Sequence, residues 1–421
     1  MRVAIIGGGV SGLGAAIALA GRPGVETTLY EQAPRLGGHA HTIDVDHGGR
    51  PVAVDVGFIV YNELNYPDLT ALFAWAGVET IASDMSFALS CSDGGFEWSG
   101  RDKAPLGGLF AQRRNAVSPR FWRFLDEVRR FQTRARADVA AGAIGEETLA
   151  DYLAGRGFGA ALRDDYVAPM GAAIWSMTPG ETLAFPARAF LAFFDNHRLL
   201  QWDRPVWRTV KGGSRTYVAA LERRLGATLR KGVAARAVRR QGAGVVVEDA
   251  AGGVSAHDAA IFATHAPTAL ALLADATAAE RDVLGAFRVS ANRVVVHRDA
   301  ALMPRRRAAW AAWNALRKDR AARPAVTYWM NRLQALPDET PLFVTLNPDR
   351  PVAPEKIFAT FDVDHPLYDG AAIAAQSRLK TIQSGALRFA GAWTGYGFHE
   401  DGLRSGLAAA RAFGGEAPWR R

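Results

Sequence analysis

The sequence predicts an α/β protein, α+β when the whole chain is counted, in which a nucleotide-binding fold carries an inserted domain of antiparallel sheet plus helices. Three observations support this prediction. Residues 2–20 have the pattern of a strand, a glycine-rich turn and a helix. The chain of 421 residues is too long for one small core, which indicates two packed domains or one domain with a large insertion. Residues 75–201 are helix-biased and fit the inserted part.

The composition is typical of a folded globular protein. Hydrophobic residues make up 49% of the chain and charged residues 22%, which excludes a disordered or fibrous protein. The single cysteine, Cys91, excludes an internal disulfide and a cysteine-based metal cluster, and we expect it to be a small buried or edge residue. No apolar run reaches the roughly 18 residues that span a bilayer, and a strand starting at Arg2 leaves no room for a signal peptide. We therefore expect a cytoplasmic protein whose membrane contact, if any, is peripheral and on the inner face.

The net charge of +8 is concentrated in two arginine-rich stretches. Residues 113–136 interleave eight arginines with apolar residues at near-helical spacing, which predicts a basic amphipathic helix. Residues 305–323 form the second stretch, with Trp310 and Trp313 among the charges. Both stretches fit a solvated protein face, and both also fit attraction to anionic lipid headgroups. No nucleic-acid-binding motif accompanies the charge, so nucleic acid is not an expected partner.

The first chemical signal lies at the N-terminus. Residues 2–6 form an apolar run typical of a buried parallel strand, and they lead into a Gly-x-Gly-x-x-Gly turn at residues 7–12. A helix is expected over residues 11–20 and a second strand over residues 27–30, ending at Glu31. This order and spacing predict a dinucleotide-binding βαβ unit.

The residues of the turn have separate physical roles. Gly7 permits the tight turn, Gly9 lets the backbone approach a pyrophosphate, and Gly12 allows helix and strand to pack closely. The helix N-terminus offers N–H groups and partial positive charge to phosphates, while Glu31 can accept hydrogen bonds from ribose hydroxyls. A glycine turn without a ligand is the alternative interpretation, but the strand, the helix, the spacing and the acid together favour binding.

A second glycine loop follows and favours FAD over NAD. Residues 35–42, Arg-Leu-Gly-Gly-His-Ala-His-Thr, place a glycine pair between basic side chains, as suits a loop that presses on a pyrophosphate from the other side. Here the sequence resembles the superfamily of flavin-dependent amine oxidases, phytoene desaturases and protoporphyrinogen oxidases, which has an Arg-x-Gly-Gly-Arg type motif at this place. His39 stands where the superfamily often has arginine or lysine, which weakens one phosphate contact. Residues 55–58 resemble the next flavin-proximal turn.

The resemblance continues through the middle of the chain. Residues 210–217 are similar to the Gly-Gly segment that returns the chain to the nucleotide-binding domain, and residues 259–264 resemble the strand that closes this domain. Between them, residues 233–247 have the pattern of paired strands with a hairpin turn near residues 242–244.

The C-terminal stretch completes the resemblance. Residues 387–391 predict a strand, residues 392–402 a loop, and residues 403–413 a helix whose N-terminus would lie beneath the flavin pyrimidine. Most relatives have an acidic residue directly after the glycine, where this chain has Ala392. The ribityl or phosphate contact of that acid is therefore absent or supplied by Glu400 or Asp401.

These motifs together imply non-covalent FAD binding. The residues to which the resemblance assigns it are Gly7, Gly9, Val10, Ser11, Gly12, Glu31, Gln32, Arg35, Gly37, Gly38, His39, Phe58, Val233, Gly391, Glu400, Asp401 and Leu403. The implied fold is a glutathione-reductase-type FAD-binding Rossmann domain made of residues 1–75, 208–267 and 377–421. Residues 76–207 and 268–376 form the substrate-binding domain.

Two residues are predicted to be catalytic, His399 and Tyr396. A histidine on the flavin-facing loop can remove a proton near neutral pH, which makes His399 the first candidate for a base. Tuning of the flavin potential and a structural role are the alternatives for His399. We expect Tyr396 and Trp393 to stack near the flavin ring, and Glu400 or Asp401 to orient His399. No histidines and carboxylates stand at metal-ligand spacing, so no metal site is predicted.

Residues 326–334, 344–348 and 395–402 narrow the resemblance to predicted FAD-binding proteins associated with cyclopropane-fatty-acid-synthase-like methyltransferases. This subgroup implies dehydrogenation or desaturation of an acyl chain, in a fatty acid or phospholipid, on the way to methylated or furan fatty acids. It also implies a lipid methyltransferase as a partner. The aromatic-rich residues 185–194 and 202–207 fit either a tunnel for an apolar substrate or plain core.

Three other functions stay open at this point. An amine oxidase is the default for the superfamily, but the strand at residues 294–297 lacks the lysine typical of those enzymes. An isoprenoid-type desaturase would act on another apolar substrate. A flavin-binding partner of the methyltransferase would not be catalytic.

Overall fold

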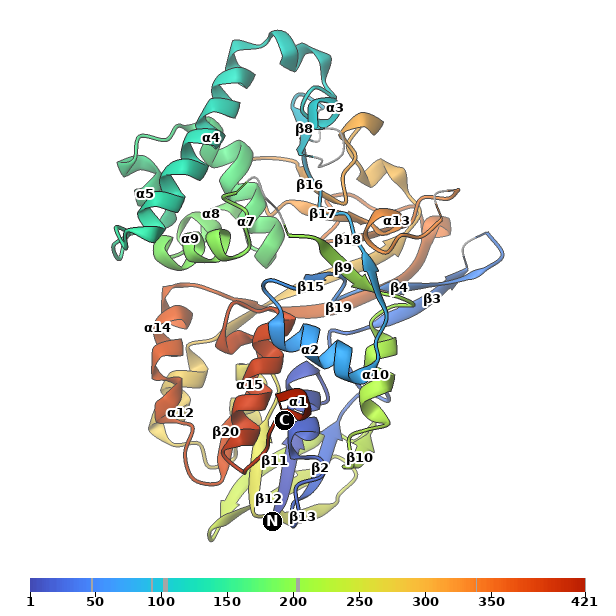
Figure 1. Cartoon of the computed structure of the whole chain (residues 1–421), viewed down its shortest axis with the longest axis vertical. Helices are drawn as coiled ribbons and strands as arrows, with labels where there is room; N and C mark the ends of the chain where they lie inside the picture. The colour runs from blue at the N-terminus through green and yellow to red at the C-terminus, as the bar shows by residue number, and fades with distance from the viewer. Residues whose placement is uncertain (47, 92–93, 101–104, 202–204, 338, 421) are drawn as a thin grey trace.

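The computed structural model describes residues 1–421 apart from residues 47, 92–93, 101–104, 202–204, 338 and 421. Two large sheets organise these residues (Figure 1). A five-stranded sheet lies near both chain ends, and a seven-stranded sheet lies on the side away from them, next to a group of helices.

The five-stranded sheet is assembled from segments that are far apart in the sequence. Every neighbouring pair of its strands is parallel. In spatial order the strands are β10 (Thr228–Lys231), β2 (Glu26–Glu31), β1 (Arg2–Ile6), β14 (Ala259–Phe262) and β20 (Leu387–Phe389). All three segments expected in the nucleotide-binding domain contribute strands, whereas the domain boundaries themselves stay a prediction.

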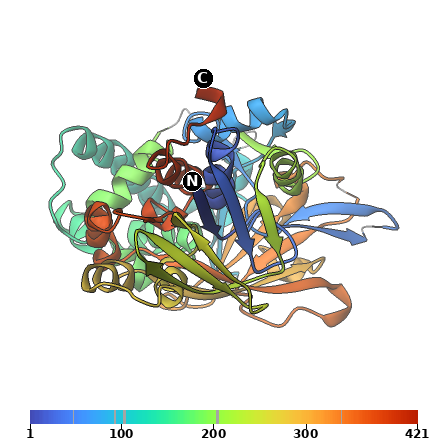
Figure 2. The ribbon, with the colours of Figure 1, turned by 90° about the horizontal axis from the view of Figure 1, so that it is seen from below.

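Alternate residues of β1 point into two different cores. Val3 and Ile5 face a helical layer, and Ala4 and Ile6 face an antiparallel sheet on the other side. Figure 2 shows the two layers on opposite sides of the parallel strands. The helical layer consists of α1 (Val10–Leu19), α10 (Arg215–Glu222) and α15 (His399–Arg411), and the antiparallel sheet of β11 (Ala235–Gln241), β12 (Gly244–Asp249) and β13 (Val254–His257). Such double coverage explains why β1 is apolar on both faces. The expected hairpin joins β11 and β12.

The seven-stranded sheet is antiparallel except where β16 runs parallel to β7. Its strands, in spatial order, are β19 (Ile357–Leu367), β15 (Arg288–His297), β18 (Phe343–Leu346), β17 (Ala325–Trp329), β16 (Trp313–Arg317), β7 (Phe87–Cys91) and β8 (Glu97–Gly100). The helices that share a core with its β7–β8 end are α4 (Pro119–Ala140), α5 (Leu149–Gly155), α6 (Ala160–Leu162), α7 (Ala168–Trp175) and α9 (Ala187–Asn196). The fold class, a nucleotide-binding α/β fold with an inserted antiparallel sheet plus helices, is therefore confirmed.

Shorter elements connect these parts. They are β3 (Thr42–Asp46), β4 (Pro51–Asp55), β5 (Tyr61–Asn62), α2 (Pro67–Ala76), β6 (Thr80–Ala82), α3 (Pro105–Leu109), α8 (Pro179–Leu183), β9 (Trp207–Val210), α11 (Ala266–Leu272), α12 (Ala278–Gly285), α13 (Met330–Leu333) and α14 (Gly370–Arg378). Strands β3 and β4 form a hairpin, and β5, β9 and β6 form a small antiparallel sheet. None of the described helices combines the length and the apolar composition required to cross a bilayer.

Two expected helices have different boundaries. The C-terminal helix α15 begins at His399, four residues before the expected Leu403, because the Asp401 carboxylate accepts the N–H groups of Tyr396 and Phe398 and caps an earlier turn. The arginine-rich helix does not start at Arg113. A 3₁₀ turn ends at Val117, and α4 starts after Ser118, whose hydroxyl accepts the Phe121 N–H.

Glycine allows α15 to cross α1 at close range. A Cβ on Gly406 would lie 2.0 Å from the Ser11 carbonyl oxygen, and a Cβ on Gly14 would lie 2.7 Å from Leu403 Cδ1. A side chain at either glycine would separate the two helices. The crossing therefore places the N-terminus of α15 beside the N-terminus of α1.

Substitution Gly406→Ala tests this constraint. The added methyl group clashes with backbone, so we expect the free energy of unfolding to fall by about 2–4 kcal/mol, measured by chemical denaturation. Gly155→Ala is the control, because Gly155 lies in α5 and a Cβ there has no neighbour within 4 Å. We expect the control to change stability by at most about +1 kcal/mol. Equal effects of the two substitutions would show that the close crossing is not required.

Candidate cofactor and active site

Two glycine loops lie against each other at the end of β1. The Gly37 N–H donates to the Gly8 carbonyl (2.8 Å), and Gly9 and Gly37 form an isolated β-bridge. Gly38 has a φ of +56°, and a Cβ on it would lie 3.0 Å from Gly9 Cα. A side chain at Gly38 would therefore be strained and would push the loops apart. The two loops are therefore in direct contact, whereas the expected contact of the second loop with a pyrophosphate stays a prediction.

The N-terminus of α1 opens toward these loops without a side-chain cap, because Gly9 is the N-cap residue. The side chains of Val10 and Ser11 turn toward α15, where a Cβ on Gly402 would meet Val10 Cγ1 at 2.7 Å and Ser11 Oγ at 3.1 Å. Backbone N–H groups and the positive end of the helix dipole therefore face the loops, which suits an anionic group such as a pyrophosphate.

Glu31 ends β2 beside the first loop. Its buried carboxylate accepts the N–H groups of Gly8 (2.7 Å) and Ala33 (2.8 Å). The Val233 N–H donates to the Glu31 carbonyl (3.0 Å), and Gln32 is exposed next to it. The structure thus brings three of the expected cofactor-binding residues to one edge of the parallel sheet.

Arg35 stabilises the second loop. Its Nη1 donates to the carbonyls of Leu36 (3.4 Å), Gly38 (3.1 Å) and Ala40 (3.4 Å). Burial lowers the pKa of Arg35, and the negative charge of Glu31 opposes this effect. Arg35 therefore shapes the glycine loop through Nη1.

Four histidines from different segments converge beside this loop. We call them the histidine cluster: His39, His265, His365 and His399. The His39 ring lies 5.7 Å from the His265 ring and 5.8 Å from the His365 ring, and His365 Nδ1 lies 2.9 Å from Ser176 Oγ. His39 and Gly38 are accessible to solvent, although elements from both halves of the molecule surround them. In the described part of the chain, no three His, Cys, Asp or Glu side chains are arranged to hold a metal ion.

Burial holds three members of the histidine cluster in the neutral form. It lowers the pKa of His265 to about 4 and the pKa values of His365 and His399 to about 3. The pKa of His39 is lowered by burial as well, and once His39 takes up a proton its charge adds to the effect in all three cases. The site is therefore lined by imidazoles that stay uncharged at neutral pH.

His399 is held by two aromatic neighbours. Its ring stacks on Phe58 with 3.8 Å between centroids and 12° between planes, and its Nε2 lies 2.7 Å from the Tyr217 hydroxyl. Burial raises the pKa of Tyr217, so the hydroxyl keeps its proton and is able to donate a hydrogen bond to Nε2. Tyr217 orients His399, which corrects the expectation that Glu400 or Asp401 does so. The low pKa also makes His399 a weak proton acceptor, which favours a tuning or positioning role over a base.

Glu400 and Asp401 accept backbone N–H groups of α2 and of the loop before α15, respectively. Glu400 accepts the N–H groups of Asp68 (3.0 Å) and Leu69 (2.9 Å) in the first turn of α2, and burial raises its pKa to about 7. Asp401 accepts the N–H groups of Tyr396 (3.0 Å) and Phe398 (3.1 Å). Glu400 is buried against α2, which argues against a ribityl or phosphate contact from this acid. The contact predicted for Asp401 stays a prediction.

Three other residues expected at the cofactor bond or pack within the protein. The Leu403 side chain is fully buried against α1, and the Gly391 N–H donates to Ser405 Oγ (2.9 Å). Trp393 is buried with its ring 4.6 Å from Phe287, on the side of the parallel sheet away from α15. The expected stacking of Trp393 on the flavin is therefore wrong.

The inserted helices and the loop before α15 together form an aromatic wall, which consists of Trp175, Phe193, Tyr396 and Phe398. Phe193 of α9 stacks on Phe398 (5.0 Å, 17°) and lies 5.7 Å from Tyr396. Trp175 Nε1 donates to the Tyr396 carbonyl (3.2 Å). Burial, assisted by the charge of Asp401, raises the pKa of Tyr396, which therefore keeps its hydroxyl proton. The wall joins the C-terminal loop to the inserted helices.

Asp55 links the site to the seven-stranded sheet. Its buried carboxylate accepts the Ser214 N–H (2.9 Å) and hydroxyl (2.7 Å), the Thr42 hydroxyl (2.6 Å) and Gln334 Nε2 (3.1 Å). Burial raises its pKa to about 6 in spite of these donors. Asp55 opens the turn that ends at Phe58, so this network positions the ring on which His399 stacks.

Comparison with known proteins assigns the family. The sequence matches the flavin containing amine oxidoreductases over residues 10–296. The chain belongs to this family. No curated protein sequence matches it. The family assignment makes the protein an FAD-dependent oxidoreductase, and the stacked glycine loops, the uncapped α1 N-terminus and the accessible Gly38 fit the pyrophosphate of FAD.

Solved structures of flavin enzymes share the fold. Putrescine oxidase bound to putrescine is 15% identical with a TM-score of 0.67, and the match covers 98% of this chain and 99% of that one. Cyclohexylamine oxidase from Brevibacterium oxydans is 16% identical with a TM-score of 0.68, and a fatty acid isomerase from P. acnes is 16% identical with a TM-score of 0.66. Both of these matches cover 98% of each chain. At such identities the likeness shows the fold alone.

Several residues of the site lay outside the sequence prediction. Tyr217 stands in the recognised Gly-Gly segment and His265 directly after a recognised strand, so a search for polar residues next to the motifs would have found them. His365 and Ser176 lie in segments without any motif. Their pairing arises only when β19 and the end of α7 meet.

Substitution His399→Ala tests the role of this histidine in the flavin oxidoreductase. We expect FAD to stay bound, because the glycine loops are untouched, and flavin reduction in stopped-flow experiments to slow by about 10–100-fold. Tyr217→Phe is the matched control, since it keeps the ring and removes only the donor to Nε2. A shifted flavin potential in both variants would identify tuning. Unchanged rate and potential in both would leave His399 a structural role only.

The lowered pKa values also predict acid sensitivity. Unfolded histidines take up protons below their ordinary pKa of 6.5, whereas His365 stays neutral in the fold until the pH approaches 3. Its contribution to stability is therefore present above pH 6.5 and is lost as the pH falls toward 3. We expect His365→Gln to reduce the loss of unfolding free energy between pH 7.5 and pH 5 by about 1–2 kcal/mol, measured by urea denaturation. Ser176→Ala should lower stability equally at both pH values, because it removes no titrating group.

Proposed function

We propose that this FAD-dependent oxidoreductase dehydrogenates an acyl chain of a fatty acid or phospholipid. The observation that carries the proposal is the aromatic wall beside the histidine cluster. Trp175 and Phe193 belong to the inserted helices, whereas Tyr396 and Phe398 precede α15. Trp175 and Phe193 are buried in the core, whereas Tyr396 and Phe398 are partly exposed. Partly exposed aromatic rings next to uncharged imidazoles suit a substrate that has neither charge nor polar groups at the reacting carbons.

In this reaction the protein needs mainly to align the acyl chain with the flavin and to exclude water. Bound FAD would accept a hydride from one carbon while a proton leaves the neighbouring carbon, which creates the double bond. The aromatic wall would hold the chain and exclude water from the reacting carbons. The low pKa values make the imidazoles of the histidine cluster weak proton acceptors, so an imidazole would hold the proton only briefly and pass it to water. His399 and Tyr396 remain our candidates for catalysis.

The strand at residues 294–297 favours an acyl chain over an amine. These residues belong to β15, and all four are buried. Val294 and Val296 pack in the core, and His297 Nε2 bonds the Thr345 hydroxyl (2.7 Å). The lysine typical of amine oxidases is absent from this strand. Among the similar folds, the fatty acid isomerase supports the view that this architecture can hold an acyl chain. Because the other two are amine oxidases, amines are included among the compounds tested below.

The proposal includes two partners, a lipid methyltransferase and a membrane surface. The resemblance of residues 326–334, 344–348 and 395–402 to methyltransferase-associated proteins supports the first. Contact with a membrane surface is required if the acyl chain belongs to a phospholipid. Co-purification of this chain with such a methyltransferase, and faster flavin reduction in its presence, would support the partnership.

An anaerobic absorbance titration tests the substrate. The purified flavoprotein is mixed with phospholipid vesicles that contain unsaturated or methyl-branched acyl chains. We expect the absorbance band of the oxidised flavin at about 450 nm to bleach. Vesicles with the same headgroups and saturated, unbranched chains serve as the control and should leave the band unchanged.

The other outcomes separate the alternatives. Bleaching by putrescine or cyclohexylamine, with hydrogen peroxide released in air, would replace the proposal with amine oxidation. Bleaching by an isoprenoid alone would indicate an isoprenoid desaturase. A bound flavin that none of these compounds reduces would indicate a non-catalytic partner of the methyltransferase.

A further inference from the structure

The segment from Leu106 to Arg123 forms a projecting end of the molecule, which we call the tip. It comprises most of α3, a 3₁₀ turn and the start of α4, and it lies at the edge farthest from the chain ends (Figure 1). The tip contains no acidic residue. Its four arginines are all exposed: Arg113, Arg114, Arg120 and Arg123. The surface of the tip is therefore strongly positive.

Large apolar side chains are exposed on the same segment. Leu106 is 68% exposed, Val117 82% and Trp122 52%. Eight large hydrophobic residues in the described part of the chain are exposed, and three of them lie in this one stretch. Apolar groups gathered within a basic surface mark a contact site, because isolated exposed residues would be scattered over the molecule.

The protein holds these side chains in place. Trp122 Nε1 donates to the Ala116 carbonyl (2.9 Å), and the Trp122 ring packs against Phe110 at 5.6 Å. Asn115 Nδ2 donates to the Glu97 carbonyl (3.0 Å), which fastens the 3₁₀ turn to β8. The apolar groups therefore stay at the surface and are presented by a preformed structure.

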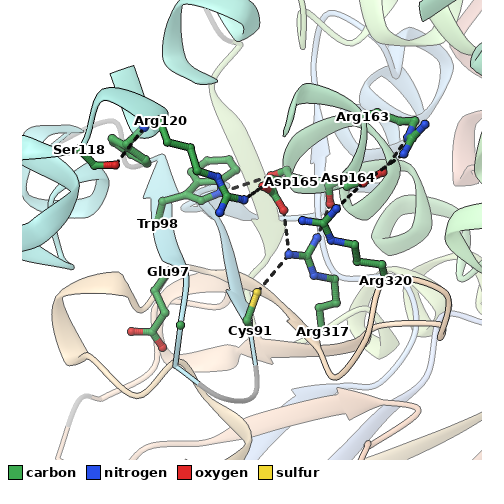
Figure 3. A network of polar contacts seen from close by, with 12 residues as sticks. Cys91, Glu97, Trp98, Ser118, Arg120, Arg163, Asp164, Asp165, Arg317 and Arg320 are labelled. Atoms are coloured by element: carbon green, nitrogen blue, oxygen red, sulfur yellow. Dashed lines mark hydrogen bonds and ion pairs between the residues drawn. The ribbon is translucent and has the colours of Figure 1, made fainter. Parts of the chain in front are cut away.

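A buried ion-pair network fixes the start of α4 to the sheet (Figure 3). Asp165 lies between Arg120 (3.3 Å) and Arg317 (2.7 Å), and Arg317 also donates to Cys91 Sγ (3.1 Å). Asp165 is buried, so removal of its arginine partners would leave an uncompensated buried charge and destabilise this contact. Arg120 is engaged here, and the outward charge of the tip rests on Arg113, Arg114 and Arg123.

The second arginine-rich stretch of the sequence adjoins the tip. Helix α3 contacts the 3₁₀ turn Arg307–Ala309, and Arg306 pairs with Glu97 of β8 (2.7 Å). The two stretches, nearly 200 residues apart in the chain, therefore contribute to one basic region.

We propose that the tip docks on the anionic surface of a lipid bilayer. The arginines match the charge of the headgroups, while Trp122, Val117 and Leu106 enter the boundary between headgroups and acyl chains. A nucleic acid would use the arginines but would leave Leu106 and Val117 in water. Docking does not require turnover, so this proposal can fail or succeed independently of the substrate assigned above.

Sedimentation with vesicles tests the docking surface. The FAD-loaded protein is mixed with vesicles of phosphatidylcholine alone or with about one third phosphatidylglycerol, and binding is measured at two salt concentrations. We expect binding to the anionic vesicles only, with weaker binding at high salt. The triple variant Arg113→Gln, Arg114→Gln, Arg123→Gln should bind about 100-fold more weakly, at roughly fivefold for each arginine.

Two further variants separate docking from general attraction. Leu106→Ser, Val117→Ser, Trp122→Ser should weaken binding about tenfold without changing net charge. The control Arg223→Gln, Arg236→Gln, Arg411→Gln removes the same charge from exposed positions of the nucleotide-binding half and should bind like the unaltered protein. Equal losses in the control and in the arginine variant would overturn the proposal. It would also fail if duplex DNA bound as tightly and the serine variant kept full vesicle binding.

Discussion

The contact between two glycine loops is the constraint on which the rest of this site depends. Gly9 and Gly38 meet so closely that a single methyl group on Gly38 would reach the opposite backbone. This contact sets the distance between the N-terminus of α1 and the loop that contains Arg35 and His39. Backbone N–H groups rather than side chains are therefore presented to the pyrophosphate, which is an arrangement that tolerates no added bulk.

The crossing of α1 and α15 extends the same constraint across the molecule. Gly406 brings α15 onto Ser11, so the first turn of α15 lies beside the glycine loops. That turn carries His399, which reaches Phe58 and Tyr217. The loop just before it carries Tyr396 and Phe398, which reach the inserted helices. The N-terminal turn of α15 and the loop before it thus join the cofactor-binding half to the half expected to bind the substrate.

The local patterns of the sequence were sufficient for the strand, turn and helix at residues 2–20, for the second glycine loop and for the hairpin between β11 and β12, because each depends on neighbouring residues. The start of α15 was misplaced, since its cap depends on the Asp401 side chain folding back on Tyr396 and Phe398. Glu400 was assigned to the cofactor because its binding to the first turn of α2, more than 300 residues earlier, leaves no local sign.

The sequence by itself determined the family, the cofactor and the residues of the glycine loops, because these follow from short motifs whose chemistry depends on a few adjacent positions. Only the tertiary structure decided which polar groups meet. His39, His265, His365 and His399 come from four separate segments, and burial keeps the last three imidazoles neutral. The two arginine-rich stretches likewise become one surface only when α3 packs near Arg307. Burial and long-range contact are properties of the packed chain, so no local pattern could reveal them.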